Sequence, residues 1–315
     1  MQIIRHAAVL PPALSGGVVA IGNFDGVHRG HQAVIGQAGT IARNLGAPLI
    51  VLTFEPHPRS VFQPDAPAFR LTSLRAKARF LEALGVDGLV VLRFDRALAA
   101  MAAEDFVSRV LMRDLSCRHV VVGEDFAFGR GRLGNVGLLK EMGGSGGFAV
   151  SPAVQERAED GAVISSNTIR EHLRLGRPDA AAALLGRPWE VDGHVIHGEA
   201  RGRDLGFPTA NVRMGSHLAP QPGVYAVRAG LEESGGAVRW LDGAANFGTR
   251  PQFEGEDARL EVFLMDFSGD LYGQLLRVAF IAYLRPEAAF PSLDALIAQM
   301  NQDVEDARSR LAAAR

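Results

Sequence analysis

The sequence has a single cysteine, Cys117, and no long uninterrupted apolar run. One cysteine excludes an internal disulfide framework and fits a reducing compartment. No apolar stretch approaches the roughly 20 residues that a transmembrane helix needs. Near the start, Pro11 and Pro12 interrupt the chain before a signal-type apolar core develops. We therefore expect a cytoplasmic protein that does not bind a membrane.

An excess of charge of one sign is also lacking. The net charge is −2, so there is no basic field of the kind that attracts nucleic acid or anionic lipid. Low-complexity tracts and internal repeats are absent from the sequence as well. What is present is an ordinary globular composition, with 47% hydrophobic residues in a chain of 315. This length favours about two domains, each able to bury its own core.

The most informative stretch is residues 21–32, which read Ile-Gly-Asn-Phe-Asp-Gly-Val-His-Arg-Gly-His-Gln. A short β-branched run precedes it, and the proline-free residues 32–45 that follow predict a helix. A strand and a Gly-rich turn that opens a helix leave backbone N–H groups and the positive helix end free for an anion. His28 and His31 are three residues apart on the first turn and therefore face one side. There they could follow the charge that develops on a leaving pyrophosphate.

Other interpretations of this histidine pair compete. The two side chains could be ordinary structural residues, or half of a metal site that still needs further ligands. Only His57 stands in a comparably polar segment. The dinucleotide pattern G-x-G-x-x-G is absent, because Gly22, Gly26 and Gly30 are spaced by four. We favour phosphate binding over zinc.

The first half of the sequence alternates strand-like and helix-like segments. Further apolar strands are predicted at residues 48–54, 88–94, 119–123 and 148–154, and helices at 73–84, 102–115 and 136–142. Continuous apolar strands separated by helices indicate a parallel sheet covered on both faces. Ligands of such sheets bind beyond the carboxyl ends of the strands.

Three chemically rich turns follow predicted strands, at residues 23–26, 54–58 and 123–129. Glu55-Pro56-His57-Pro58 is either a stiff turn or a partner for an aromatic ring system, and the sequence leaves both open. Phe126 and Phe128 would face one side of a strand, which core packing explains equally well.

A helix is predicted from about residue 166 to residue 175, with Ser165 or Ser166 as its N-cap. Arg170 lies near the start of this helix, where a cation is disfavoured by the helix dipole. We interpret Arg170 as a partner of a polyphosphate.

The pattern changes near Gly186, where we place the boundary between domains 1–186 and 187–315. Residues 198–211 carry glycines spaced by four, and Thr209 and Asn211 have oxygen-bearing side chains of the kind that Mg²⁺ takes alongside phosphates. A plain surface loop is the alternative for this segment. Strands are predicted at 223–230, 238–246, 260–267 and 275–284, and Ser292 should cap a final amphipathic helix.

Glu261 is the one carboxylate among the apolar residues at the start of the third of these strands. Burial beside apolar side chains is how a general base acquires a usable pKa. Alternatively, Glu261 is solvated at the strand start.

In this order and spacing, the motifs closely resemble the prokaryotic bifunctional riboflavin kinase/FAD synthetase family over nearly the whole chain. The resemblance rests on residues 22–31, 54–58, 123–129, 165–170 and 202–211 together with Glu261. It implies an α/β nucleotidyltransferase-like N-terminal domain with a Rossmann-like parallel sheet. It also implies a C-terminal six-stranded Greek-key β-barrel of riboflavin kinase type with a C-terminal helix.

By this resemblance, the N-terminal domain transfers AMP from ATP to FMN and releases pyrophosphate, giving FAD. His28, His31 and Arg170 would be catalytic. The implied ATP and phosphate contacts are Gly22, Asn23, Phe24, Asp25, Gly26, Ser165 and Ser166. The implied flavin contacts are Phe54, Pro56, His57, Pro58, Asp125 and Phe128.

The C-terminal domain would phosphorylate riboflavin, with Glu261 accepting the proton of the ribityl hydroxyl. The implied ATP contacts are Gly202, Gly206, Thr209 and Asn211, the last two also holding Mg²⁺. The implied partners are the small molecules riboflavin, FMN, FAD and ATP, and the implied assembly is a monomer or a transient homo-oligomer.

Three positions depart from the family pattern, namely Asn167, Gln252 and Phe263. The substitutions near Glu261 leave the alternative of an FAD synthetase with an impaired kinase domain. A non-catalytic flavin-binding regulator is a further alternative, against which the histidine pair and Glu261 argue.

Overall fold

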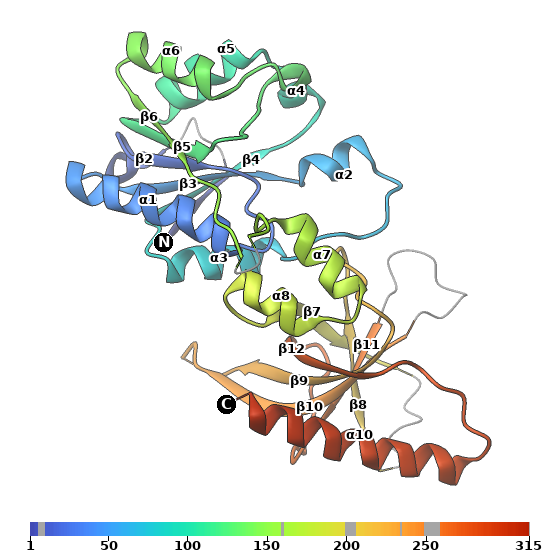
Figure 1. Cartoon of the computed structure of the whole chain (residues 1–315). Helices are drawn as coiled ribbons and strands as arrows, with labels where there is room; N and C mark the ends of the chain where they lie inside the picture. The colour runs from blue at the N-terminus through green and yellow to red at the C-terminus, as the bar shows by residue number, and fades with distance from the viewer. Residues whose placement is uncertain (6–9, 159–160, 199–205, 234, 249–258, 315) are drawn as a thin grey trace. The chain divides into compact units, whose positions relative to one another are not determined.

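The computed structural model describes residues 1–5, 10–158, 161–198, 206–233, 235–248 and 259–314. The chain forms two compact units (Figure 1). The first unit consists of Met1–Ala66 and Leu74–Ile164, and the second of Pro67–Ser73 and Ser165–Arg315. The short segment Pro67–Ser73 thus belongs to the second unit although it lies far from the rest of that unit in the sequence.

The first unit is built on a six-stranded sheet in the order β1-β4-β3-β2-β5-β6. Its strands are β1 (Gln2–Ile4), β2 (Val18–Ile21), β3 (Leu49–Glu55), β4 (Gly88–Arg93), β5 (His119–Gly123) and β6 (Ala149–Ala153). Every pairing is parallel. The central strands are buried on both faces, which explains their continuous apolar sequences. The predicted parallel α/β sheet is confirmed.

Helices cover both faces of this sheet. One face packs against α1 (Arg29–Leu45) and α3 (Leu74–Ala83), and the other against α5 (Ala103–Asp105), η3 (Phe106–Asp114) and α6 (Val136–Gly146). The shorter elements are η2 (Pro12–Leu14), α2 (Pro58–Phe62), α4 (Arg96–Ala99) and η4 (Arg130–Arg132). The single helix expected at 102–115 is instead one α-helical turn that continues into the π-helical η3.

The chain order places a topological switch point at the end of β2. From β2 the chain moves to β3 and β4 on one side, and later to β5 and β6 on the other. Crevices at such points are where open α/β sheets bind ligands. The three polar turns predicted from the sequence follow β2, β3 and β5, which are neighbours in the sheet.

The second unit contains a closed antiparallel barrel in the order β10-β11-β8-β7-β12-β9. Its strands are β7 (Trp189–Ile196), β8 (Thr209–Arg213), β9 (Gly223–Glu232), β10 (Val238–Phe247), β11 (Arg259–Leu264) and β12 (Leu275–Arg285). After β9, β10 and β11, the chain returns with β12 beside β9, which is the Greek-key order. The predicted six-stranded Greek-key barrel is confirmed. Strand β11 ends earlier than expected, because Asp266 adopts a left-handed φ of 56° in the turn that follows.

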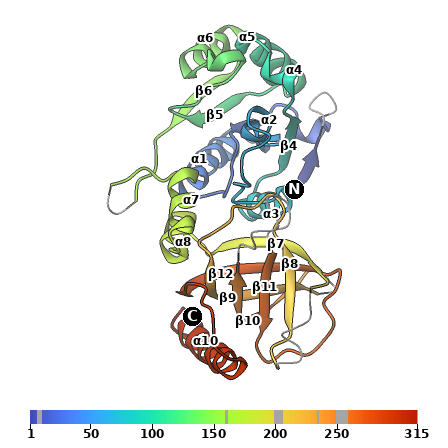
Figure 2. The same cartoon turned by 90° about the vertical axis from the view of Figure 1, so that its right-hand side faces the viewer.

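The last helix, α10 (Leu293–Ala313), lies along the barrel (Figure 2). Ser292 caps it by accepting the N–H of Ala295, as predicted. Ala307 and Leu311 bury its apolar side among residues of β9 and β10. The unit also contains α7 (Ser166–Arg174) and α8 (Pro178–Leu185).

Specific hydrogen bonds hold the segment Pro67–Ser73 in the second unit. The indole N–H of Trp189 donates to the carbonyl of Leu71 at 2.9 Å. The hydroxyl of Ser73 lies 2.8 Å from both carboxylate oxygens of Asp192. These partners are more than 100 residues apart in the sequence, so no local sequence pattern predicts these contacts.

Candidate active sites

The turn after β2 holds an unusual backbone conformation. Phe24 and Val27 have φ values of 49° and 44°, in the left-handed region that L-residues other than Gly, Asn and Asp rarely adopt. The Phe24 ring is buried and folds back over Gly22, where a Cβ would lie 3.1 Å from it. Such a turn persists only where the surrounding structure determines it.

His28 is the N-cap of α1, just before the first helical turn rather than within it. Its Nδ1 accepts the backbone N–H of His31 at 3.3 Å, so the neutral ring carries its proton on Nε2. The two imidazole rings are stacked, with centroids 3.6 Å apart. At Gly30, a Cβ would lie 3.2 Å from the His28 ring, and glycine allows this close packing. The predicted common orientation of the two histidines is confirmed.

The surroundings of the two histidines also allow the alternative of a zinc site to be compared with the phosphate interpretation. Among the residues that the structure describes, no three His, Cys, Asp or Glu side chains are grouped so as to hold a metal ion. The His28 nitrogen Nδ1 already accepts a hydrogen bond. His57 lies in the next turn, where its Nδ1 accepts the N–H of Arg59 and caps α2. The arrangement favours an anion at the N-terminus of α1 over a cation.

Aromatic side chains gather at the same edge of the first unit. We call this set the aromatic cluster; its members are Phe54, Phe62, Phe94, Phe106, Phe126 and Phe128. Successive ring centroids lie 5.5 to 6.5 Å apart. Phe126 and Phe128 lie in a turn rather than on a strand, yet their rings stack at 17° and face one way. Phe62 is 66% exposed. Phe106 and Phe128 are buried in the core, whereas Phe54, Phe94 and Phe126 are partly buried. The rings that remain accessible offer an aromatic surface that suits a flat apolar ring.

The remaining predicted residues of the first unit differ in exposure. Asp25 is buried in the turn after β2, whereas Asn23 and Asp125 are exposed. Pro56 is exposed after a cis Glu55–Pro56 bond, and Pro58 is the first residue of α2.

Ser165, Ser166 and Arg170 belong to the second unit. Ser165 is the N-cap of α7 and accepts the N–H of Thr168 at 3.2 Å. Arg170 is buried; its Nε donates to the carbonyl of Phe69 at 2.8 Å and its Nη1 to Asn167 Oδ1 at 2.7 Å. Asn167, one of the departures from the family pattern, therefore orients the guanidinium. That these residues contact ATP stays a prediction.

In the barrel, the strand register brings Glu261 and Asn211 together. Glu261 on β11 lies directly opposite Asn211 on β8 and Asn246 on β10. Thr209 and Phe263 form the next outward-facing pair. Opposed residues of antiparallel strands share a face, and here that face is the outside of the barrel. The inward positions of β11 are filled by the buried residues Leu260, Val262 and Leu264.

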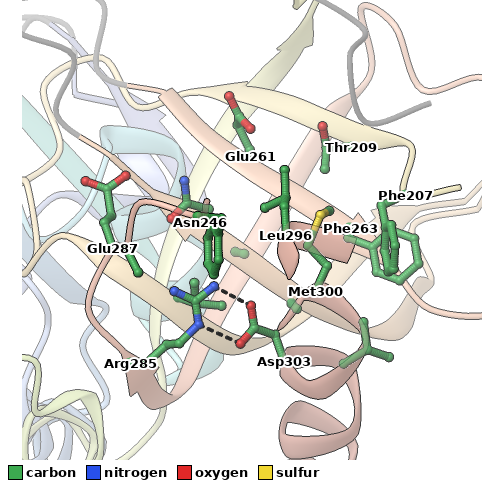
Figure 3. Close-up of a pocket in the computed structure, with 16 residues that line it drawn as sticks. Phe207, Thr209, Asn246, Glu261, Phe263, Arg285, Glu287, Leu296, Met300 and Asp303 are labelled. Carbon is green, nitrogen blue, oxygen red and sulfur yellow. Dashed lines mark hydrogen bonds and ion pairs between the residues drawn. The ribbon is translucent and has the colours of Figure 1, made fainter. Parts of the chain in front are cut away.

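A cavity of about 340 Å³ lies between this face and α10 (Figure 3). Its polar wall includes Thr209, Asn246 and Glu261. Its apolar wall is formed by Phe207, Val224, Ala244, Ala245, Phe263, Ala288, Phe290, Leu296, Met300 and Val304. Glu261 is half-buried at the cavity. A pocket with a few polar groups and an otherwise apolar lining is typical of a small-molecule site.

An ion pair closes one side of this cavity. Arg285 at the end of β12 donates through Nε and Nη2 to the two carboxylate oxygens of Asp303 on α10, at 2.7 and 2.6 Å. Gln299 also donates to Asp303 at 2.9 Å. The pair fixes α10, and with it the apolar wall, against the barrel.

The sequence did not reveal several residues of these sites. Asn246 sits among apolar residues of its strand, which is the same signal that singled out Glu261. The Arg285–Asp303 pair and the Phe62 and Phe94 rings have no local signature. Of the other residues singled out in the sequence, Gly202 and Gln252 lie outside the described residues. Gly206 has a φ of 84°, and a Cβ added there would meet open space.

Comparison with known proteins identifies both units. The family model for FAD synthetase matches residues 10–168, and that for riboflavin kinase matches residues 185–311. The bifunctional riboflavin kinase/FMN adenylyltransferase of Escherichia coli K12 is 42% identical over 98% of this chain and 97% of its own. The chain belongs to this family. The Bacillus subtilis member is 37% identical over 92% of this chain and 91% of its own.

The fold also occurs among solved structures. A crystal structure described as a macrolide-efflux protein from Streptococcus pneumoniae matches with a TM-score of 0.86 at 30% identity, covering 98% of this chain and 99% of that chain. None of the helices within the described ranges is long and apolar enough to cross a membrane.

Proposed function

We propose that this protein phosphorylates riboflavin to FMN and then adenylylates FMN to FAD, using ATP in both steps. The observation that carries the proposal is the position of Glu261, beside Asn211 and Asn246 on a cavity of small-molecule size. Residues 187–315 would carry the kinase activity and residues 1–186 the adenylyltransferase activity. On this proposal the enzyme is cytoplasmic and works as a monomer or a transient homo-oligomer.

In the kinase step, Glu261 accepts the proton of the ribityl 5′-hydroxyl as the oxygen attacks the γ-phosphorus of ATP. The new O–P bond forms while the bond to the β–γ bridging oxygen breaks, and ADP leaves. The apolar wall between α10 and the barrel would take the flavin ring. Positioning supplies most of the rate in such an in-line displacement.

The donor set at Thr209 and Asn211 fits Mg²⁺. A hydroxyl and an amide oxygen are hard ligands, and Mg²⁺ binds through few protein groups while keeping waters and phosphates. Asn211 is packed so closely against Gly198 that a Cβ there would lie 2.3 Å from its amide, which holds the side chain in place. When bound with ATP, the ion neutralises phosphate charge.

In the adenylylation step, a phosphate oxygen of FMN attacks the α-phosphorus of ATP and pyrophosphate leaves. The His28 Nε2–H and the backbone N–H groups at the start of α1 donate to phosphate oxygens as their charge grows. His31, stacked on His28, shares this role. We assign the aromatic cluster, with His57, Pro56, Pro58 and Asp125, to the flavin side, and Ser165, Ser166 and Arg170 to ATP.

Product analysis of the full-length protein tests the proposal. Riboflavin and Mg-ATP should give FMN and then FAD, resolved by chromatography. An FAD synthetase with an impaired kinase would convert added FMN to FAD and leave riboflavin unreacted. A non-catalytic regulator would bind flavin without consuming ATP. The intact row of Asn211, Glu261 and Asn246 favours the two-step enzyme over both.

A further inference from the structure

A fully buried lysine lies beneath the turn that precedes α1. The Lys77 side chain on α3 is only 1% exposed. Its ammonium donates to the backbone carbonyl of Asn23 at 2.8 Å, to Thr53 Oγ1 at 3.4 Å and to Glu55 Oε1 at 3.3 Å. A buried charge is costly unless it is paired and hydrogen-bonded. Here, three acceptors match the three N–H donors of the ammonium.

The carbonyl of Asn23 receives a second hydrogen bond. The buried hydroxyl of Thr53 donates to it at 3.1 Å, while accepting from Lys77. This carbonyl immediately precedes Phe24, the first residue with left-handed φ in the turn. Two donors on one carbonyl therefore hold the strained turn from beneath, which is the kind of support that such a conformation needs.

The third contact reaches the neighbouring turn. Glu55 is the last residue of β3 and directly precedes Pro56 and His57. Lys77 thus joins the turn after β2, which leads to His28, to the turn after β3. The two turns bear the groups that we assign to ATP and to the flavin.

We propose that Lys77 is a positioning residue for adenylyl transfer. It sets the turn before His28 relative to the turn after β3, so that the ATP phosphates and the flavin phosphate meet in line. This inference rests on the proposed function, and Lys77 itself touches no substrate. A misplacement of the reacting atoms by about 1 Å costs on the order of 10²-fold in rate.

Lys77→Met in the full-length protein tests this role, because methionine fills similar space without the donors. The kcat for FAD formation from FMN and ATP should fall on the order of 10²-fold. FMN formation from riboflavin, measured in the same preparation, should be unchanged. Glu55→Gln should lower kcat less, and the effects of the two substitutions should be non-additive, as expected of residues in contact.

Leu81→Ala is the matched control, since Leu81 is equally buried on α3, four residues further on, and its apolar side chain makes none of the hydrogen bonds that join Lys77 to the two turns. It should lower thermal stability while FAD formation by the folded fraction stays near wild type. An equal loss of kcat in Leu81→Ala and Lys77→Met, or a wild-type kcat in Lys77→Met, overturns the proposal.

If Lys77→Met does not fold, the positioning role of Lys77 is tested instead with Thr53→Val and Glu55→Gln. Thr53→Val removes both hydrogen bonds of the Thr53 hydroxyl, and Glu55→Gln removes the charge that pairs with Lys77. A wild-type kcat in both variants overturns the positioning role. The outcome for the proposed function is separate. A wild-type protein that forms no FAD from FMN and ATP refutes the function itself, whatever the variants do.

Discussion

Glu261 lies directly opposite Asn211 in the register of β11 and β8. Side chains of such a pair share a face, with Cβ atoms about 4.5–5.5 Å apart. The proposed base and a proposed ATP ligand are thus placed together by the hydrogen-bond ladder of two neighbouring strands. A slip of one residue in this ladder would turn Glu261 toward the barrel interior.

Glu261→Gln should abolish most of the kinase activity. The amide cannot accept the hydroxyl proton, and loss of a general base typically costs about 10²–10⁴-fold. Riboflavin phosphorylation should fall by that factor, while adenylylation of added FMN stays unchanged, both measured by chromatography of the flavin products.

Glu190→Gln is the control for this variant. Glu190 lies on β7 of the same barrel and pairs with Arg277, and it is not part of the cavity lining. Its kinase rate should match the wild type. A normal kinase rate in Glu261→Gln would remove Glu261 from the mechanism.

His28 can be tested by separating its two roles. His28→Asn keeps a strong N-cap residue but removes the Nε2–H donor, whereas His28→Ala removes both and should cost roughly 1 kcal/mol of stability. Both variants should lose adenylylation, by about 10²–10³-fold if the donor acts on developing charge. Riboflavin phosphorylation should persist in both.

Thermal unfolding distinguishes the two His28 variants, because only His28→Ala should unfold at lower temperature. Wild-type FAD formation in His28→Asn would show that the histidine serves only as a cap. An equal loss of both activities would contradict the assignment of His28 to adenylylation alone.

The parallel sheet and the turn after β2 could be predicted because their signals are local. Continuous apolar strands alternate with helices, and the residues around His28 and His31 combine a strand, a Gly-rich turn and a helix start. Glu261 likewise stands out locally, as the carboxylate among the apolar residues of β11, although both faces of this strand are apolar and the sequence alone did not tell which one lies outside the barrel. Each of these features depends on spacing within about a dozen residues.

The features that escaped prediction arise from contacts distant in the sequence. From the sequence alone, Lys77 resembles an ordinary surface lysine of an amphipathic helix. Only the fold brings its ammonium to the carbonyl of Asn23, 54 residues away. The segment Pro67–Ser73 joins the second unit through Trp189, 118 residues from Leu71. Asn246 can be assigned to the site only after the pairing of β10 with β11 places it opposite Glu261.

The Arg285–Asp303 pair should control riboflavin affinity. Asp303→Asn leaves the Arg285 guanidinium without its carboxylate. Because the two side chains are 22% and 8% exposed, the cost should be smaller than the about 3–5 kcal/mol of breaking a fully buried pair. We expect a lower unfolding temperature and a raised KM for riboflavin, because α10 carries the apolar wall of the cavity. Steady-state kinase assays and thermal melts measure the two effects.

The double variant Arg285→Met/Asp303→Leu is the matched control, since apolar replacement of a buried pair is often neutral for stability. It should recover the unfolding temperature. An unchanged riboflavin KM in Asp303→Asn would show that the pair does not shape the cavity.

Cys117 should report on the folding of the first unit. Burial raises the pKa of its thiol to about 12, so the reactive thiolate is scarce at neutral pH. In the native protein the reaction with a thiol reagent should be slow and limited by unfolding, and it should become fast in denaturant. Because the folded pKa lies above the ordinary thiol value of 9.0, the thiol favours folding below pH 9 and loses that contribution as pH rises toward 12. Denaturant midpoints between pH 8 and pH 11 should therefore fall less in Cys117→Ala than in the wild type, and parallel declines would contradict this prediction.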